Sequence, residues 1–286
     1  MAVDLRRGRL FVAELGNGTL DVIDIAERRV VRRVSGFKDP QGVGYSPAAD
    51  VVSVASAGDG SVRLFRGEEL SPVGVLDLGD DADNVRVDPR SGQVFIGYGK
   101  GGLAVVDPVS HSVVSRAKLP AHPEGFGIDA TENRAYVNVP DAHQIAVVDL
   151  GTGRQIATWQ VSGLRSSYSM ALDEAQGLLA TAFWDPARLV LLDTATGAVK
   201  ANIETCGDAD DVFFDAKRRR IYVSCGTGEV DVVQQDGTGI HPLARIPTQF
   251  GARTSLFVPE LDRLFVAARA GLLGSDAAIL VFQPGP

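Results

Sequence analysis

The sequence predicts an all-β chain, a seven-bladed β-propeller of four-stranded antiparallel blades. Three observations predict this fold class: one phrase recurs about every 42 residues, each copy contains several short β-type runs, and helical periodicity is absent. Repeats of about 40–45 residues with four strands each are typical of propellers. A closed array of 286 residues can be a single unit, so we expect one domain over residues 1–286.

The copies can be aligned by the residue that ends the first apolar run of each unit. Successive anchors of this kind lie 42, 42, 41, 44, 42 and 43 residues apart. The anchors are Asp4, Ser46, Asp88, Asp129, Asp173, Asp215 and Val258. The corresponding repeats cover about 1–42, 43–84, 85–125, 126–168, 169–211, 212–254 and 255–286. Such constant spacing indicates seven copies of one supersecondary unit.

Each unit is expected to contain four strands. In the first unit, the first strand ends at Asp4 and a second begins six residues later with Leu10–Val12. A third run, Leu20–Ile23, starts 16 residues after the anchor, and a more alternating fourth run is Val30–Val34. Short runs with a period of two, separated by turns such as Asn17-Gly18, indicate antiparallel hairpins.

The last unit is predicted to be incomplete. Its third run is Ile279–Phe282, and Gln283–Pro286 is too short and too rich in proline to add a fourth strand. Met1 already lies in the first strand of the first unit, so no upstream segment remains to complete the last one. We therefore predict a three-stranded last blade, and we expect that a longer parent chain once supplied the missing strand.

Composition excludes several classes of protein. The net charge of −8 opposes binding to nucleic-acid phosphates and to anionic membranes. No apolar run approaches the 18 or so residues that cross a bilayer, and MAVDLRRGRLFV leaves no room for a secretion signal within this chain. HExxH, GxSxG and Walker motifs are absent. With two cysteines, one disulfide is the most that the chain can form.

The aligned unit resembles the YVTN-type repeat of the YncE-like β-propeller family. The matching phrases are RLFVAELGNGTLDVIDI, RAYVNVPDAHQIAVVDL and RRRIYVSCGTGEVDVV, with the preceding runs GVGY, NVRVD and FGID. The resemblance extends from Met1 to Phe282. It implies a bacterial protein of the periplasm or the extracellular space. The resemblance is specific for architecture and not for function, because members of the family serve unrelated purposes. Some relatives bind nucleic acid, which the acidic balance of this chain argues against.

The candidate ligand residues lie at equivalent places before the first strand of each blade. In a propeller these connections share one face, around the mouth of the central channel. Most of the candidates lie seven, five or four residues before an anchor, and Arg165 lies one residue further away. They are Asp39, Gln41, Asp81, Asp83, Asn84, His122, Glu124, Arg165, Tyr168, Asp208, Asp210 and Arg253. We expect these side chains to surround the channel mouth and to bind a small molecule, a metal ion or a partner.

The acidic residues of this group allow three interpretations. They are solvated side chains that cap turns, or ligands of a divalent cation, or catalytic carboxylates. Carboxylates that converge need hydration, protonation or a neutralising cation, and Arg165 and Arg253 could supply the positive charge. The predicted metal ligands are Asp83, His122, Glu124 and Asp210. Their oxygens suit Ca²⁺ or Mg²⁺, and His122 would admit a transition metal.

Other residues that attract attention have simpler explanations. Asp24, Asp107, Asp149 and Asp193 recur at the end of the third strand, where they are expected to stabilise turns. His143 precedes a third strand and could join His122. Trp184 could form an aromatic wall beside Tyr168. Cys206 and Cys225 could form a disulfide, remain inert thiols, or bind a soft metal with a nearby histidine.

Two functions from different classes remain. The first is a non-catalytic propeller that binds a ligand, metal ion or partner at its acidic channel mouth. The alternative is a metal-dependent enzyme of the propeller lactonase or lyase type, in which a cation at the same mouth polarises the substrate or activates water. Binding of single-stranded nucleic acid would need a positively charged groove, which this sequence lacks. Metal analysis of the purified protein separates the first two.

Overall fold

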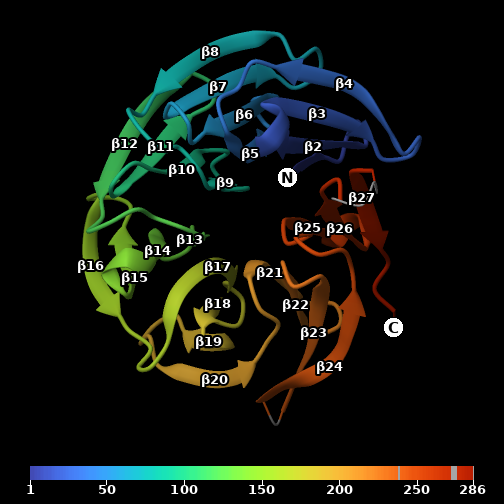
Figure 1. Ribbon diagram of the computed structural model, residues 1–286. Coiled ribbons are helices and arrows are strands. Elements are labelled where there is room, and N and C mark those ends of the chain that lie inside the picture. The colour runs from blue at the N-terminus through green and yellow to red at the C-terminus, as the bar shows by residue number, and fades with distance from the viewer. Residues whose placement is uncertain (238, 272–275, 286) are drawn as a thin grey trace. The chain divides into compact units, whose positions relative to one another are not determined.

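The computed structural model describes residues 1–237, 239–271 and 276–285. Their strands form seven antiparallel sheets, six with four strands and the last with three (Figure 1). The described helices are three short 3-10 turns, Leu15–Asn17, Pro140–Ala142 and Pro259–Leu261, so no described helix has the length that a bilayer crossing requires. The sheets are the blades of a seven-bladed β-propeller, which confirms the predicted fold class.

The chain divides into two compact units, and the first, Met1–Thr158, contains four blades. The first blade consists of β1 (Ala2–Asp4), β2 (Arg9–Glu14), β3 (Thr19–Asp24) and β4 (Arg29–Ser35). The second consists of β5 (Pro40–Ser46), β6 (Val51–Ser56), β7 (Ser61–Arg66) and β8 (Pro72–Asp77). The third consists of β9 (Val85–Val87), β10 (Val94–Tyr98), β11 (Gly102–Asp107) and β12 (Ser112–Lys118). The fourth consists of β13 (Phe126–Asp129), β14 (Arg134–Val139), β15 (Gln144–Asp149) and β16 (Arg154–Trp159).

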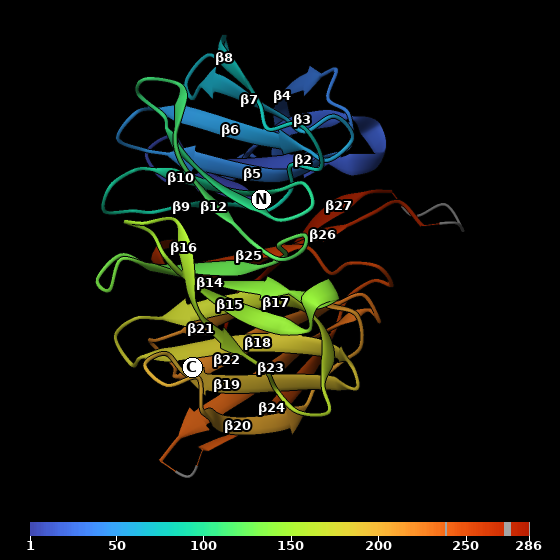
Figure 2. The same cartoon turned by 90° about the vertical axis from the view of Figure 1, so that its left-hand side faces the viewer.

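The second unit, Trp159–Pro286, contains the other three blades. The fifth blade consists of β17 (Arg165–Asp173), β18 (Leu178–Asp185), β19 (Ala187–Asp193) and β20 (Val199–Glu204), which run side by side in Figure 2. The sixth consists of β21 (Ala209–Asp215), β22 (Arg220–Cys225), β23 (Glu229–Asp236) and β24 (Gly239–Pro247). The seventh consists of β25 (Ser255–Val258), β26 (Arg263–Ala268) and β27 (Ala278–Phe282). The expectation of a three-stranded last blade is thus confirmed for the described residues.

Within each unit the hydrophobic core lies between successive sheets. In the first unit, Phe11 and Leu20 of the first blade pack with Val52 and Phe65 of the second. In the second unit, Leu189 packs with residues of the sixth blade such as Ile221 and Val223. Inside a unit, the second and third strands of a blade that lies between two others are buried on both faces, as in β6 and β11, which explains why they read as nearly continuous apolar runs. The fourth strands alternate because only one of their faces is covered.

The anchor aspartates close the turn between the first and second strands. Asp4 accepts hydrogen bonds from the backbone N–H groups of Arg6 and Arg7. Asp88 and Asp129 do the same for residues two and three positions later. Asp24, Asp107, Asp149 and Asp193 have this role after the third strand. The predicted turn stabilisers are therefore confirmed, and their regularity has a backbone cause.

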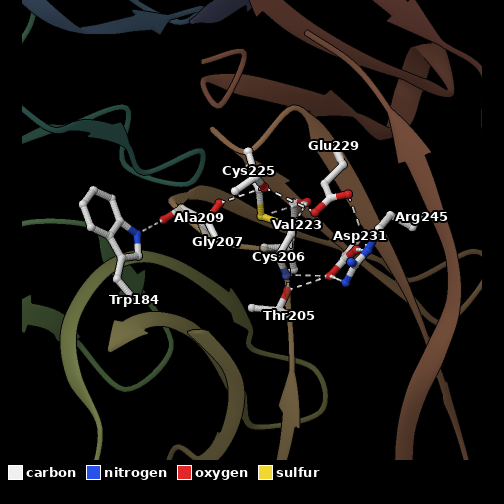
Figure 3. Close-up of a disulfide and its surroundings, with 11 residues drawn as sticks. Trp184, Thr205, Cys206, Gly207, Ala209, Val223, Cys225, Glu229, Asp231 and Arg245 are labelled. Atoms are coloured by element: carbon white, nitrogen blue, oxygen red, sulfur yellow. Dashed lines mark hydrogen bonds and ion pairs between the residues drawn. A yellow bond between two sulfur atoms is a disulfide. The ribbon is translucent and has the colours of Figure 1, made fainter. Parts of the chain in front are cut away.

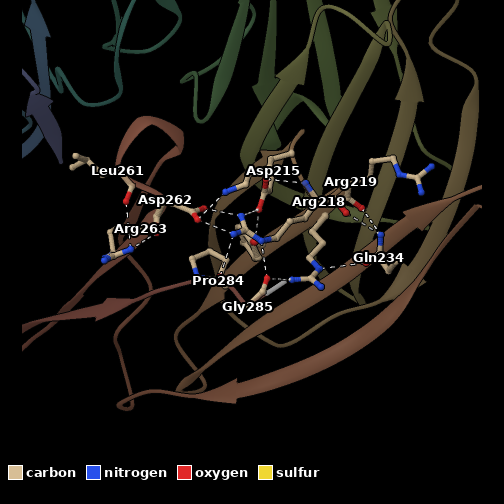
Figure 4. A network of polar contacts seen from close by, with 12 residues as sticks. Asp215, Arg218, Arg219, Gln234, Leu261, Asp262, Arg263, Pro284 and Gly285 are labelled. Atoms are coloured by element: carbon tan, nitrogen blue, oxygen red, sulfur yellow. Dashed lines mark hydrogen bonds and ion pairs between the residues drawn. The ribbon is translucent and has the colours of Figure 1, made fainter.

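An ion network at the anchor of the sixth blade reaches the seventh (Figure 4). Arg218 donates to buried Asp215 at 3.0 Å and binds both carboxylate oxygens of Asp262 at 2.7 and 2.8 Å. Tyr222 donates to Asp215 at 2.7 Å; burial and this hydrogen bond raise the pKa of Tyr222, so its hydroxyl keeps the proton. Arg218 also donates to the carbonyl oxygen of Gly285 at 2.7 Å. The network therefore joins two blades and also binds the backbone at Pro284 and Gly285.

The first strands of three blades begin earlier than the predicted repeat boundaries. They start at Pro40, Arg165 and Ala209 rather than at residues 43, 169 and 212. In each, a β-bulge leaves one residue unpaired, and the strand continues beyond it. In the third, fourth and seventh blades the first strand starts at residues 85, 126 and 255, as predicted. The errors in these three strand boundaries thus come from β-bulges, which do not change the apolar pattern of the sequence.

Candidate functional site

The residues seven positions before the anchors share a backbone conformation. Asp39, Asp81, Ser166, Asp208 and Gly251 have φ angles of 51°, 42°, 59°, 59° and 80°, and His122 is the exception. Asp is among the few residues that enter this left-handed region readily. The carbonyl oxygens of three of them accept a backbone hydrogen bond from the facing hairpin. The recurrence of aspartate at this position therefore has a structural cause, as the turn interpretation predicts.

The residues five positions before the anchors are placed differently. Gln41, Tyr168 and Asp210 are the extra residues of the three β-bulges, which the strand register skips. Asp83 and Glu124 occupy the equivalent position just before β9 and β13. A bulge re-aims the side chain of its extra residue away from the regular pleat. This position, rather than that of the recurrent aspartates, is where the repeat presents variable side chains.

In the first unit, three of the predicted residues converge. Asp83, His122 and Glu124 each offer one potential ligand atom, and these atoms lie within 4.8 Å of one another. All three side chains are half-buried. Asp81 lies beside them, with a carboxylate oxygen 3.4 Å from Nδ1 of His122. We refer to Asp83, His122 and Glu124 as the candidate cation site.

The backbone holds these residues in place from both sides. The N–H group of Asp83 donates to the carbonyl oxygen of Gly97 at 3.0 Å, and that of Glu124 donates to Asn138 at 2.9 Å. The backbone carbonyl oxygen of Asn84 accepts a hydrogen bond from the N–H group of Gly97 at 3.0 Å. Both loops thus continue the ladders of β10 and β14. The side chains of Asp83 and Glu124 therefore project from backbone that hydrogen bonds hold in place, as a preorganised site requires.

The imidazole of His122 is oriented by a backbone carbonyl. Its Nδ1 lies 2.7 Å from the carbonyl oxygen of Gly99, and because a carbonyl oxygen can only accept, Nδ1 must carry the proton. In the neutral ring the lone pair is then on Nε2. A hydrogen bond from the other ring nitrogen to a carbonyl is the arrangement that orients metal-bound histidines. Gly99 could not be recognised from the sequence, because it contributes a backbone carbonyl and no side chain.

The remaining predicted residues of the first unit are more peripheral. Asp39 and Gln41 are exposed, and Asn84 is half-buried. His143 is exposed and ends a 3-10 turn in the left-handed conformation, and the candidate cation site does not include it. The structure therefore does not confirm the suggested pairing of His143 with His122.

Gly42 packs directly against the backbone of Asp83. A Cβ atom at Gly42 would lie 1.8 Å from the carbonyl oxygen of Asp83 and 2.6 Å from a methyl group of Val85. We expect Gly42→Ala to displace the Asp83 loop and to lower the free energy of unfolding by about 1–3 kcal/mol, the usual cost of overpacking. Denaturant unfolding measures this change. Gly16→Ala is the matched control, because nothing lies within 4 Å of that position; equal effects of the two variants would contradict the prediction.

In the second unit, the predicted residues form an ion pair beside an aromatic pair. Arg253 pairs with Asp208, and its Nε lies 3.7 Å from a carboxylate oxygen of Asp210. The guanidinium also lies 5.6 Å from the ring centre of Trp184, within cation–π range. Asp210, the fourth predicted metal ligand, thus lies close to the positively charged guanidinium group of Arg253. Arg253 neutralises acids here, as one of the sequence interpretations expected, whereas Arg165 is exposed at the start of β17.

The expected proximity of Trp184 and Tyr168 is confirmed. Their ring centres are 4.1 Å apart, and the planes are inclined by 40°. Trp184 donates its indole N–H to the carbonyl oxygen of Ala209 at 2.7 Å. Both side chains are half-buried. The pair therefore provides a partly exposed aromatic surface next to Arg253.

Cys206 and Cys225 form a disulfide between buried positions (Figure 3). Of the three sequence interpretations, the structure selects this one. Their Cα atoms are 5.9 Å apart, a normal separation for a disulfide. The N–H group of Cys206 also donates to Asp231 at 2.8 Å, and Asp231 is paired with Arg245. The disulfide thus holds the loop that leads to Asp208.

Loss of the disulfide is expected to lower the free energy of unfolding by about 3 kcal/mol, since it closes a loop with a sequence separation of 19. Denaturant titrations with and without a thiol reductant measure the loss. The double variant Cys206→Ser, Cys225→Ser is the control, because its stability should not respond to reductant. An unreduced protein with two titratable thiols would contradict the assignment.

Comparisons with known proteins bear on the fold. No protein-family model and no curated protein matches the sequence. Among solved structures, the chain is similar to one described as Kuenenia stuttgartiensis hydrazine synthase, with a TM-score of 0.84 and 14% identity over 97% of this chain and 92% of that chain. A chain of the mitotic checkpoint complex gives a TM-score of 0.80 and 13% identity over 93% and 82%. Likeness at such low identity shows the propeller fold alone.

Proposed function

We propose that the protein is a non-catalytic propeller of the YncE-like type that binds a divalent cation through Asp83, His122 and Glu124. The observation that carries this proposal is the convergence of three ligand atoms within 4.8 Å, on two loops that backbone hydrogen bonds fix. Ligands about 2.1 Å from one zinc ion lie at most about twice that distance apart. Small side-chain rotations are therefore enough to bring the three atoms around one ion.

The donor set favours a transition metal over Ca²⁺. Ca²⁺ takes six to eight oxygen ligands, whereas one imidazole and two carboxylates suit Zn²⁺, Co²⁺ or Mn²⁺. The orientation of His122 by Gly99 supports this preference. A bound divalent cation would offset two of the three negative charges of Asp81, Asp83 and Glu124. An open coordination position on it would accept an oxygen or nitrogen donor, so the ligand class we propose is a small molecule or a partner segment that carries such a donor.

Equilibrium dialysis of the metal-free protein against Zn²⁺, Co²⁺, Mn²⁺, Ca²⁺ and Mg²⁺ tests the proposal. We expect one transition-metal ion to bind per chain, more tightly than Ca²⁺ or Mg²⁺, and to raise the melting temperature through ligand linkage. No uptake of any of the five ions at about 1 mM, which corresponds to a binding free energy weaker than about −4 kcal/mol, would exclude the site.

The YncE-like assignment and an exported location belong to the same proposal. The YVTN-like phrases support the family, and the propeller fold is consistent with it. The buried disulfide supports an oxidising compartment such as the periplasm or the extracellular space, because cytosolic thiols are kept reduced. Mass spectrometry of protein alkylated directly in its native cells tests this location. Free thiols at Cys206 and Cys225 would contradict it.

A metal-dependent lactonase or lyase is the second candidate. One specific observation favours it: three protein ligands are the number that catalytic zinc sites use, with a fourth position left for water or substrate. Hydrolysis of a panel of simple lactones by the zinc-loaded protein distinguishes the two functions. Turnover that is lost in His122→Gln would favour the enzyme, and zinc binding without turnover would favour the binding protein.

A further inference from the structure

The two inner strands of the fifth blade extend beyond the pattern of the repeat. The second strand of each other blade ends ten residues after its anchor, whereas β18 ends at Asp185, twelve residues after Asp173. Trp184 is one of the two additional residues. β17 has nine residues and contains Tyr168 as the extra residue of its β-bulge. A local departure from a regular pattern is where a functional site is expected, and here it presents an aromatic pair.

Three charged side chains lie beside the aromatic pair. Arg253 pairs with Asp208, and its guanidinium also lies close to Asp210 and to the ring of Trp184. The side chains of Arg253, Asp208 and Asp210 are 41%, 38% and 32% exposed, so all three are within reach of a ligand from solution. Tyr168 and Trp184 are half-buried, so part of each ring also reaches the solvent. We refer to these five residues as the Trp184 surface.

The backbone beneath the Trp184 surface is held by covalent and hydrogen bonds. The indole N–H of Trp184 donates to the carbonyl oxygen of Ala209 at 2.7 Å (Figure 3). The disulfide-bonded Cys206 lies two residues before Asp208, whose carbonyl oxygen accepts a hydrogen bond from the N–H group of Gly226 at 2.9 Å. A Cβ atom at Gly226 would lie 1.8 Å from a carboxylate oxygen of Asp208, so this carboxylate packs directly on the turn. A surface ordered in advance loses little conformational entropy on binding.

The charges of the Trp184 surface favour a neutral ligand. A cationic ligand would be repelled by the guanidinium of Arg253, and an anionic ligand would be repelled by the carboxylates of Asp208 and Asp210. The guanidinium only donates hydrogen bonds and the carboxylates only accept them, whereas the hydroxyl of Tyr168 does both. Neighbouring hydroxyl groups on a ligand match this alternation, because each of them both donates and accepts.

The aromatic rings determine the shape of the ligand. Because the planes of Tyr168 and Trp184 are inclined by 40°, a flat heterocycle stacks on only one of them, whereas the C–H groups of a puckered sugar ring contact both. We propose that the Trp184 surface binds a neutral carbohydrate, with the C–H face of a pyranose ring against the two aromatic rings and its hydroxyl groups hydrogen-bonded to the three charged side chains. Aromatic walls with a few polar groups that fix orientation are typical of small-molecule sites. The candidate cation site shares no residue with this surface, so the two proposals are independent.

Isothermal titration of the full chain with uncharged disaccharides tests the proposal. The probes are maltose, cellobiose, lactose and N,N′-diacetylchitobiose, which differ in the orientation and substitution of their hydroxyl groups. We expect at least one of them to bind with a dissociation constant of about 1 mM or lower. Tetramethylammonium chloride, sodium acetate and adenosine represent a cationic, an anionic and a planar ligand. No binding of any disaccharide at about 10 mM, or tighter binding of one of these three compounds than of every disaccharide, would overturn the proposal.

Matched variants locate the carbohydrate. Tyr168→Ala and Gln41→Ala truncate equivalent bulge residues of two blades; the first should weaken disaccharide binding at least about tenfold, and the second should leave it unchanged. Thermal unfolding shows whether both fold, and Asp210→Ala, which removes a partly exposed acceptor, should weaken binding by a similar factor. Unchanged affinity of Tyr168→Ala or of Asp210→Ala would overturn the proposal.

Tryptophan fluorescence reports whether the carbohydrate contacts Trp184. The chain has two tryptophans, and Trp159→Phe removes the other one. We expect the disaccharide that binds to change the fluorescence of the parent protein and of Trp159→Phe alike. If the change were absent, or if it disappeared in Trp159→Phe, the carbohydrate would lie elsewhere and the proposal would be wrong.

Discussion

Replacing His122 with glutamine is expected to lower the affinity for Zn²⁺ by about 100-fold or more. Loss of an outer-sphere partner already costs about 10- to 100-fold, and His122 is the one nitrogen donor of the candidate cation site. Glutamine has a similar length but is a poor ligand for Zn²⁺. Isothermal titration calorimetry of the metal-free variant measures the loss, and an unchanged dissociation constant would contradict the site.

A second histidine, His143, provides a control for this experiment. His143→Gln removes an imidazole that lies in an exposed turn outside the candidate cation site, so it should bind Zn²⁺ as the parent protein does. Asp83→Asn and Glu124→Gln should each weaken binding while keeping the shape of the side chain.

Replacing Arg218 with alanine is expected to lower the free energy of unfolding by about 3 kcal/mol or more. Arg218 is 10% exposed and Asp215 is 2% exposed, so the substitution leaves a buried carboxylate with Tyr222 as its remaining side-chain donor. The seventh blade also loses its bidentate link through Asp262. Denaturant unfolding monitored by circular dichroism measures the change.

Arg219→Ala is the matched control for Arg218→Ala. Arg219 is exposed, and its side chain points away from Asp215 in Figure 4. Its replacement should change the free energy of unfolding by no more than about 0.5 kcal/mol, as for other exposed positions. If the two variants were equally stable, the network would not join the blades energetically.

The same network predicts how stability depends on pH. Hydrogen bonds from Arg218 and Lys217 hold the pKa of Asp262 below its usual range. A carboxylate with a lowered pKa contributes stability above its unfolded pKa of about 4, and this contribution is lost as the pH falls through the folded value. Stability should therefore decrease progressively below about pH 4. Arg218→Ala should lose less stability than the parent protein over this acidic range.

The fold was predictable because its determinants are local and repeated. The anchors recur every 41 to 44 residues, and each second, third and fourth run became a strand that begins within two residues of the run's first residue. The errors concern the first strands of the second, fifth and sixth blades, which begin three or four residues early. A bulge adds one unpaired residue without changing the apolar pattern, so periodicity has no means of detecting it.

The candidate site was predicted only in part. Register placed Asp83 and Glu124 at one position of the repeat and His122 at another, and the structure brings their ligand atoms together. The repeat register could not distinguish these three residues from Asp39, Asp81 and Asp208, which recur because their backbone is in the left-handed conformation. Register also placed Arg253 near the acids, but it could not identify Asp208 as its partner, because an ion pair between residues 45 apart in the chain depends on distances that the repeat spacing does not give.

By itself the sequence determined the number of blades, the order of their strands and the incomplete last sheet. Each of these follows from a pattern of side chains that repeats within one unit, where neighbours in space are also neighbours in the chain. The tertiary structure alone decided the disulfide between Cys206 and Cys225, the proton on Nδ1 of His122 and the pairing of Arg253 with Asp208. Each of these depends on which atoms of separate loops and strands come within a few ångströms of one another.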